Sequence, residues 1–234
     1  MSLLAGRRIL VTGASRGLGA AVAEACAREG ASLVLVARTR GGLEEVDDRV
    51  RAAGSEATLV TLDLREGAKI DALGGTLFQR FGRLDGLVHA AAVLGSLTPV
   101  AHLPPDELDE LVAVNLIAAQ RLIRALDPLL RAAPAGRAVF VTDAVATRAP
   151  AYWGGYAATK AAMEVLVRCW AKELAITKVV VNVVDPGPMS TRLRADAFPS
   201  EAPGSMPAPE IVAPRIVPLL AETQTSTGET ARLY

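Results

Sequence analysis

The sequence has little cysteine and no excess of charge of either sign. Its 234 residues include only 2 Cys, and 25 Lys and Arg balance 25 Asp and Glu. Cys26 and Cys169 are too few for a disulfide framework, so we expect buried or semi-buried thiols in a reducing cytosol. Balanced charge gives no electrostatic footprint for nucleic acid or for an anionic membrane. We expect no metal site.

Long apolar runs are also missing, although apolar residues make up 51% of the chain. No apolar stretch approaches the ~18 residues that a membrane span needs. Arg7 and Arg8 follow the short apolar stretch at the N-terminus rather than precede it, which is the wrong order for a signal peptide. We therefore expect a cytoplasmic globule with neither a membrane nor a nucleic acid as partner. A chain of this length is expected to form one domain, residues 1–234.

Short apolar runs alternate regularly with helical stretches. This alternation predicts an α/β protein, a three-layer doubly wound parallel β-sheet with helices on both faces. Ligands of such sheets bind beyond the carboxyl ends of the strands. The expected strands are Arg8–Thr12, Ser32–Ala37, Ala57–Leu62, Gly86–Ala90, Ala138–Thr142 and Val179–Val184, with Glu229–Leu233 as a candidate last strand. The expected helices are Gly17–Glu29, Gly41–Ala53, Glu66–Phe81, Pro105–Arg131, Tyr156–Ile176 and Pro209–Ala221.

Three glycines follow the first expected strand, at Gly13, Gly17 and Gly19. Glycine lets the backbone approach a pyrophosphate closely, and the free amides of a helix N-terminus favour an anion. The spacing is Gly-x-x-x-Gly-x-Gly, which differs from the Gly-x-Gly-x-x-Gly dinucleotide fingerprint. We interpret this turn as a phosphate site, and the alternative is a tight turn without a ligand.

A tyrosine and a lysine stand four residues apart later in the chain, at Tyr156 and Lys160. In a helix these positions share a face, so the phenol and the ammonium lie side by side. An adjacent cation lowers the pKa of a tyrosine from about 10 toward the range of a general acid. The pair therefore predicts proton transfer, although the same spacing also occurs on solvated helix faces.

The segment 186–209 differs from the rest of the chain because it holds six prolines and two glycines. It leaves room only for a short turn around Thr191–Ala197. A long irregular loop in a compact domain is usually functional or disordered. Because the segment follows a strand at the ligand edge, we predict a lid over the substrate, and a passive loop is the alternative.

Four features follow one another along the chain: the glycine turn, Asn115, the Tyr156–Lys160 pair and Pro186-Gly187. The sequence resembles the short-chain dehydrogenase/reductase superfamily over essentially the whole chain, and the resemblance rests on these four features, which occur in the family's order. The resemblance implies a Rossmann-like fold, with the cofactor pyrophosphate held at the glycine turn. The cofactor-binding residues that it implies are Gly13, Ser15, Arg16, Gly17, Leu18, Gly19, Arg38, Asp63, Leu64, Ala90, Ala91, Tyr156, Lys160, Pro186, Gly187 and Thr191.

The end of the second expected strand indicates which cofactor is used. Family members that prefer NAD usually place an acidic residue there, whereas this chain has Arg38 and Arg40, with Arg16 in the glycine turn. Two guanidinium groups can bind a 2′-phosphate in bidentate fashion, which favours NADP(H) over NAD(H). The alternative is that Arg38 and Arg40 only solvate a loop. Asp63 and Leu64 resemble the family's adenine contact.

Two further stretches match the family's pattern. Asn115 resembles the helix-bending asparagine that holds a water linking the catalytic lysine to solvent, and a kink without a proton role is the alternative. Pro186, Gly187 and Thr191 resemble the segment that contacts the nicotinamide carboxamide.

The chain departs from the family after the fourth expected strand. The usual Asn-Asn-Ala-Gly is replaced by His89-Ala90-Ala91-Ala92. Ala90 removes an amide side chain that steadies the sheet, and Ala92 adds a methyl group where glycine passes close to the cofactor. We interpret His89 as a structural histidine and His102 as a loop residue.

A sharper departure concerns the family's catalytic serine, because its position thirteen residues before the tyrosine is occupied by Asp143. A serine donates to the substrate carbonyl and stabilises the developing alkoxide. An ionised aspartate would repel it, by about 4 kcal/mol for two unit charges ~4 Å apart at an effective dielectric near 20. That corresponds to a roughly thousandfold slower reaction. A protonated Asp143 could donate instead, whereas the adjacent Thr142 points to the other side of the strand.

The resemblance implies an NADP(H)-dependent oxidoreductase that interconverts a carbonyl and an alcohol on a small-molecule substrate. Tyr156 would protonate the oxygen, Lys160 would lower the pKa of Tyr156, Asn115 would supply the relay, and Asp143 would occupy the serine position. The rival hypothesis, motivated by Asp143, is a dinucleotide-binding protein with weak or no turnover that acts as a sensor or scaffold.

Family habit also implies a homodimer or homotetramer, formed through the faces of the fourth and fifth long helices. The small and apolar residues that fit such an interface would equally fit core packing. They are Ala113, Leu116, Ala161, Leu166 and Trp170.

Overall fold

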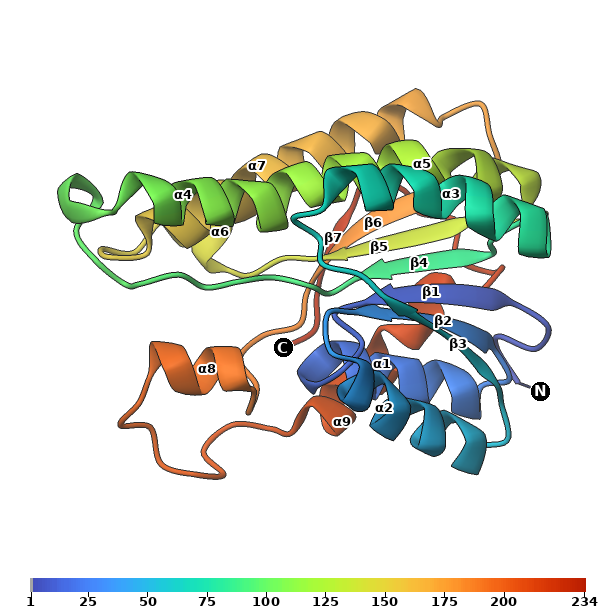
Figure 1. Cartoon of the computed structure of the whole chain (residues 1–234), viewed down its shortest axis with the longest axis horizontal. Coiled ribbons are helices and arrows are strands. Elements are labelled where there is room, and N and C mark those ends of the chain that lie inside the picture. The colour runs from blue at the N-terminus through green and yellow to red at the C-terminus, as the bar shows by residue number, and fades with distance from the viewer. Residues whose placement is uncertain (1) are drawn as a thin grey trace.

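The computed structural model describes residues 2–234, and its centre is one parallel sheet of seven strands (Figure 1). The strands are β1 (Arg8–Thr12), β2 (Ser32–Ala37), β3 (Ala57–Thr61), β4 (Gly86–His89), β5 (Arg137–Val141), β6 (Val180–Asp185) and β7 (Thr230–Arg232). They lie side by side in the order β3-β2-β1-β4-β5-β6-β7. The expected domain of residues 1–234 also includes residue 1, which lies outside the described range.

Helices cover both faces of this sheet, which confirms the expected three-layer, doubly wound α/β architecture (Figure 1). The helices are α1 (Gly17–Arg28), α2 (Arg40–Ala52), α3 (Gly67–Phe81), α4 (Pro105–Val112), α5 (Ala118–Ala132), α6 (Val145–Arg148), α7 (Gly154–Glu173), α8 (Arg192–Ala197) and α9 (Pro209–Val212). Single turns occur at η1 (Val100–His102), η2 (Ala113–Ile117), η3 (Ala213–Arg215) and η4 (Val217–Leu220). Helices α1, α2 and α9 lie on one face, and α3, α5 and α7 lie on the other.

Successive residues of each strand are buried on opposite faces of the sheet. Val11 and Val139 pack with α1, whereas Leu10 and Phe140 pack with α5 and α7, and all four side chains are buried. Strands covered on both faces need apolar residues at every position, which explains the continuous apolar runs in the sequence.

The chain reverses its winding at β1, which pairs with β2 on one side and with β4 on the other. The loops that follow β1 and β4 therefore diverge to opposite faces of the sheet, and they leave a crevice at the carboxyl ends of the strands. The glycine turn after β1 lines this crevice.

Three segments differ from the expected secondary structure. The helix expected over Pro105–Arg131 is divided into α4 and α5 by the π turn η2, which carries Asn115. The helix expected over Pro209–Ala221 shortens to α9, η3 and η4, because Pro214 and Pro218 have no N–H to donate. Helix α6 was not expected.

The two cysteines lie in helices, as expected, but in different environments. Cys26 is buried in α1, whereas Cys169 is exposed on α7, so the expectation of a buried or semi-buried thiol is wrong for Cys169. Among the helices of residues 2–234, none combines the length and the apolar character that crossing a membrane requires.

Helix α3 packs closely on α5 at Gly74. A Cβ atom built on Gly74 would lie 2.9 Å from the carbonyl carbon of Ala125 and would collide with its oxygen. The neighbouring Gly75 is exposed, and a Cβ atom there would meet nothing within 4 Å. The pair therefore provides a matched test of this helix contact.

We expect Gly74→Ala to lower the free energy of unfolding by about 1–3 kcal/mol, because the methyl group overpacks the contact with α5. Gly75→Ala should raise it by about 0.5–1 kcal/mol, because alanine is the better helix former. Denaturant titration of both variants measures the difference. Equal stability of the two variants would contradict the close packing of α3 on α5.

Candidate active site

A cleft of about 1040 Å³ extends along the carboxyl ends of β2–β6 and reaches α7 and α8. It contains the predicted site residues, apart from Asn115, which is set back behind its wall. The predicted residues that line it are Gly13, Ser15, Arg16, Gly17, Leu18, Gly19, Arg38, Asp63, Leu64, Ala90, Ala91, Asp143, Tyr156, Lys160, Pro186, Gly187 and Thr191. Within residues 2–234, no group of three His, Cys, Asp or Glu side chains is placed to hold a metal ion.

The glycine turn joins the two halves of the sheet. Gly13 has a φ of +68°, and a Cβ atom there would lie 2.9 Å from the Cα of Ala91, in the loop after β4. A Cβ atom on Gly19 would collide with the carbonyl oxygen of Gly13. Within the described chain, no side chain caps the N-terminus of α1. Its first amides therefore remain available to an anion in the cleft.

Two of the three arginines considered for a 2′-phosphate lie at the cleft. Arg16 and Arg38 both line it. Arg40 does not, because its Nε donates to Glu44 at 2.8 Å and its side chain is 80% exposed. The site thus presents a pair of guanidinium groups, and Arg40 only solvates the start of α2.

Asp63 holds its place at the end of β3 by pairing with Arg65. The Arg65 guanidinium donates to the Asp63 carboxylate, with Nη2 and Oδ2 2.6 Å apart. These hydrogen bonds, together with the nearby charge of Arg38, hold the pKa of Asp63 below its usual range. Asp63 is therefore an ionised acceptor beside the apolar side chain of Leu64, which also lines the cleft.

His89 is buried at the end of β4 and shares a hydrogen bond of 2.8 Å with the hydroxyl of Thr12. Burial, reinforced by the charge of Lys160, lowers the pKa of His89 to about 3, so its ring is neutral at ordinary pH. This agrees with a structural rather than a catalytic histidine. Ala90 and Ala91, which follow it, line the cleft with backbone and methyl groups.

Asn115 ties the π turn η2 to the loop after β4 and to α7. Its Oδ1 accepts from the amide of Val93 at 2.9 Å, and its Nδ2 donates to the carbonyl of Val93 at 2.9 Å and to the hydroxyl of Thr159 at 3.1 Å. Both side-chain N–H groups are used within the protein. A water held by Asn115 therefore has to donate to an oxygen atom of this residue.

Tyr156 and Lys160 lie side by side on α7, as their spacing predicted. The Lys160 Nζ is 5.8 Å from the centroid of the Tyr156 ring. The same ammonium donates to the carbonyl oxygen of Val141, the last residue of β5, at 2.8 Å. Both side chains are buried, and both line the cleft. The end of β5 therefore fixes the position of the pair.

The expected lowering of the tyrosine pKa is not found. Burial raises the pKa of Tyr156 above its usual range, and the charges of Asp143 and Asp185 raise it further. Burial also lowers the pKa of Lys160 to about 8, against the opposing effects of Asp143 and Glu164. The sequence-based expectation considered only the adjacent cation, whereas burial and two carboxylates outweigh it here.

Asp143 follows β5 and forms part of the wall shared by the cleft and the start of α6. Its Oδ1 accepts a hydrogen bond from the amide of Val145 at 3.0 Å. This bond satisfies one of the free amides at the N-terminus of α6. Asp143 thus has a backbone role in addition to its place beside Tyr156. Thr142 turns away from the pair, as expected, and donates to Glu164.

The segment after β6 completes the cleft. Gly187 has a φ of +76°, and a Cβ atom there would lie 2.8 Å from the ring of Tyr234. The Tyr234 hydroxyl donates to Asp185 at 3.0 Å, so this residue fixes the turn at Pro186-Gly187. Thr191 caps α8, because its hydroxyl accepts from the amide of Arg194.

Aromatic side chains form the end of the cleft nearest α8. The Trp153 ring lies 6.1 Å from the ring of Tyr156 and 5.8 Å from that of Phe198. The Arg194 guanidinium covers Phe198 at 3.7 Å and pairs with Glu201 at 2.7 Å. Tyr152 is 59% exposed and does not line the cleft.

Sequence reasoning missed two residues near the site. Tyr234 carries no local signal, because its contact with Gly187 joins distant parts of the chain. Glu164 does carry one, since it continues the four-residue spacing of Tyr156 and Lys160 within a helix of buried residues.

Comparisons with known proteins agree with this geometry. The family model described as short chain dehydrogenase matches residues 7–202. The oxidoreductase YciK of Escherichia coli (strain K12) is 34% identical over 232 residues, which is 97% of this chain and 92% of YciK.

Solved structures show the same likeness. A short chain dehydrogenase from Pseudomonas syringae has a TM-score of 0.96 and 38% identity, over 100% of this chain and 96% of its own. A short chain dehydrogenase from Escherichia coli CFT073, complexed with NADPH, has a TM-score of 0.95 and 33% identity, over 99% of this chain and 98% of its own.

The fold, the cleft and the family model lead to one assignment. The match extends over most of the chain, and the glycine turn and the tyrosine–lysine pair line the same cleft. The chain belongs to the short-chain dehydrogenase/reductase superfamily of oxidoreductases.

Proposed function

We propose that this protein is an NADP(H)-dependent oxidoreductase that interconverts a carbonyl and an alcohol on a small molecule. One observation carries the proposal. The uncapped N-terminus of α1, with its glycine turn, opens into the same cleft as Tyr156 and Lys160. An anion-binding end and a proton-transfer end in one cleft match the needs of a dinucleotide and a reducible substrate.

The residues present fit NADP(H). The glycine turn offers free amides and no Cβ atoms to a pyrophosphate, and Arg16 with Arg38 offers two guanidinium groups to a 2′-phosphate. The NADPH complex of the Escherichia coli CFT073 relative supports the same choice. Asp63 and Leu64 would meet the adenine, and Ala90, Ala91, Pro186, Gly187 and Thr191 would surround the nicotinamide. When bound, the cofactor supplies or accepts the hydride.

Tyr156 would act as the acid in carbonyl reduction. Its raised pKa keeps the phenol protonated, so it can give its proton to the carbonyl oxygen while an alcohol O–H bond forms. Lys160 would stabilise the tyrosinate that this step leaves, because its ammonium lies beside the ring. Asn115, bound to Thr159 of α7, would position a water to return the proton.

Asp143 favours a second candidate function, that of a dinucleotide-binding protein with weak or no turnover. Its carboxylate occupies the place of a hydroxyl donor and raises the pKa of Tyr156. Both effects oppose the build-up of negative charge on a reacting oxygen. Turnover in this site requires either a protonated Asp143 or a substrate that tolerates its charge.

The proposal also includes the end of the cleft where the substrate would bind and the oligomeric state of the protein. The segment 186–209 would act as a lid, since Arg194 and Phe198 line the cleft. A homodimer or homotetramer would use the outer faces of α7 and of η2 with α5, where Val165 and Ile117 are exposed. Trp170, which seemed to suit such an interface in the sequence, is buried against Phe140 and belongs to the core.

We expect Arg38→Ala to weaken NADPH binding about 10- to 100-fold, because a charge-assisted hydrogen bond to the 2′-phosphate is lost. NADH binding should change little. Arg40→Ala is the matched control, since Arg40 pairs with Glu44 outside the cleft. Fluorescence titration with both dinucleotides measures the effect, and equal losses for NADPH and NADH would refute the assigned role.

We expect Tyr156→Phe to reduce turnover of a carbonyl substrate about 10²- to 10⁴-fold, because the proton donor is removed. NADPH affinity should remain close to that of the unchanged protein. Tyr152→Phe serves as the control, because Tyr152 is exposed outside the cleft. A panel of carbonyl compounds assayed with NADPH provides the substrate. Unchanged turnover in Tyr156→Phe would remove this residue from the mechanism.

Asp143→Ser distinguishes the two functions. If the carboxylate suppresses turnover, the serine hydroxyl should raise the rate about 100- to 1000-fold, because it donates to the developing alkoxide. Steady-state kinetics with the best substrate of the panel measure this gain. If the unchanged protein turns the substrate over rapidly and Asp143→Ser does so slowly, Asp143 takes part in the chemistry.

A further inference from the structure

Tyr156 and Lys160 begin a longer polar stripe on α7. Glu164 and Arg168 follow at the same interval of four residues, so the four side chains share one face of the helix. Glu164 is 3% exposed, as is Lys160, whereas the Arg168 side chain is 42% exposed. The stripe therefore leads from the cleft to the surface, and its two inner charged members are buried.

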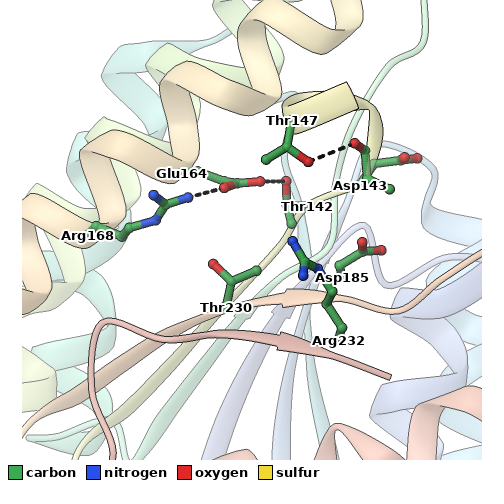
Figure 2. A pocket seen from close by; sticks show the side chains of 9 residues that line it. Thr142, Asp143, Thr147, Glu164, Arg168, Asp185, Thr230 and Arg232 are labelled. Atoms are coloured by element: carbon green, nitrogen blue, oxygen red, sulfur yellow. Dashed lines mark hydrogen bonds and ion pairs between the residues drawn. The ribbon is translucent and has the colours of Figure 1, made fainter. Parts of the chain in front are cut away.

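The end of β5 holds both inner members. Val141 accepts from the Lys160 ammonium at 2.8 Å, and the next residue, Thr142, donates from its hydroxyl to Glu164 Oε1 at 2.6 Å. Arg168 donates to the other carboxylate oxygen of Glu164. Figure 2 shows the Glu164 carboxylate between Arg168 and Thr142. Two donors thus hold this carboxylate in place.

A small polar cavity of about 50 Å³ lies behind the catalytic cleft, lined by Thr142, Asp143, Glu164 and Asp185 among others (Figure 2). Thr142 and Asp143 also border the cleft, so they form a thin wall between the two spaces. Glu164 lies on the far side of that wall. Its charge can reach Lys160 but is separated from a substrate in the cleft.

The ammonium of Lys160 needs such a counter-charge, because burying an unpaired charge is strongly unfavourable. The groups around it come from three elements. His89 of β4 is neutral, Tyr156 is a neutral phenol, and Asp143 faces the cleft, where negative charge would develop during reduction. Asp185 of β6 acts on Tyr156. Glu164 is the carboxylate that stabilises Lys160 from outside the cleft.

We propose that Glu164 is a positioning residue whose buried carboxylate keeps Lys160 protonated and seated on the carbonyl of Val141. Its consequence for turnover rests on the proposed function, but its effect on Lys160 does not. If the charge of Glu164 is removed, the ammonium keeps the charge of Asp143 but loses that of the second carboxylate, and Lys160 should release its proton at lower pH. This direction agrees with the effect of Glu164 on the pKa of Lys160, which is to raise it.

The titration of Lys160 can be followed directly, because the chain has four lysines, at positions 69, 160, 172 and 178. We would label lysine with ¹³C at Cε, record its NMR signals against pH, and assign Lys160 by its loss in Lys160→Met. Glu164→Gln should move the Lys160 midpoint down from about 8, by about one pH unit or more. Glu173→Gln removes the same charge from an exposed site on α7 and should leave it unchanged.

Two further variants keep the test decisive. Glu164→Asp retains the charge and should restore most of the original midpoint. Thr142→Val conserves volume but removes the hydroxyl that holds Glu164. Thr142→Val should also lower the midpoint of the Lys160 titration. The proposal can therefore be decided even if Glu164→Gln does not fold. An unchanged Lys160 midpoint in the folded Gln and Val variants would overturn the proposal, as would equal shifts in Glu164→Asp and Glu164→Gln.

The titration needs neither substrate nor cofactor, so its result is independent of turnover. A shifted midpoint in a protein that reduces no carbonyl would support the role of Glu164 and count against the proposed function. If turnover is found, the alkaline limb of the pH profile of kcat/KM should move to lower pH in Glu164→Gln. A purely structural effect would lower the rate at every pH without moving that limb.

Discussion

The burial of one ammonium group, that of Lys160, determines how the half of the cleft around Tyr156 is built. A charge inside a protein has to be paired and hydrogen-bonded. Here the carbonyl of Val141 provides the hydrogen bond, and Asp143 and Glu164 provide opposite charge. β5 must therefore end at this point and α7 must run beside it. The position of Tyr156 follows, because it lies one turn before Lys160 on the same helix face.

The anion-binding half is built by different means, with backbone rather than charge. Gly13 permits contact between the turn after β1 and the loop after β4, where Ala91 lies. The amides at the start of α1 then face the same crevice as Tyr156. A parallel sheet whose winding reverses at β1 brings both halves to one edge. The topology of the sheet thus creates the cleft, and the residues at its two ends can change independently of each other.

Local features of this site were predictable from the sequence, and long-range ones were not. The Tyr156–Lys160 geometry depends only on helical spacing, and the glycine turn depends only on a strand followed by a helix. The pKa direction of Tyr156 was predicted wrongly, because it depends on burial and on Asp185, which tertiary packing brings near. The contact of Tyr234 with Gly187 joins distant segments. A bend at Asn115 was expected from the family resemblance, but the π turn that divides this helix was not, since the sequence continues a helical pattern.

The bond from the Val145 amide to Asp143 has an evolutionary consequence. Aspartate and serine side chains can both accept a hydrogen bond from the amide two residues ahead, so either can satisfy the Val145 N–H. The loop therefore accommodates both, although an ionised carboxylate can only accept a hydrogen bond and a hydroxyl can also donate one. A change between the two residues at this position therefore leaves the backbone of the loop satisfied. At this position the fold can therefore stay the same while the chemistry of the side chain changes.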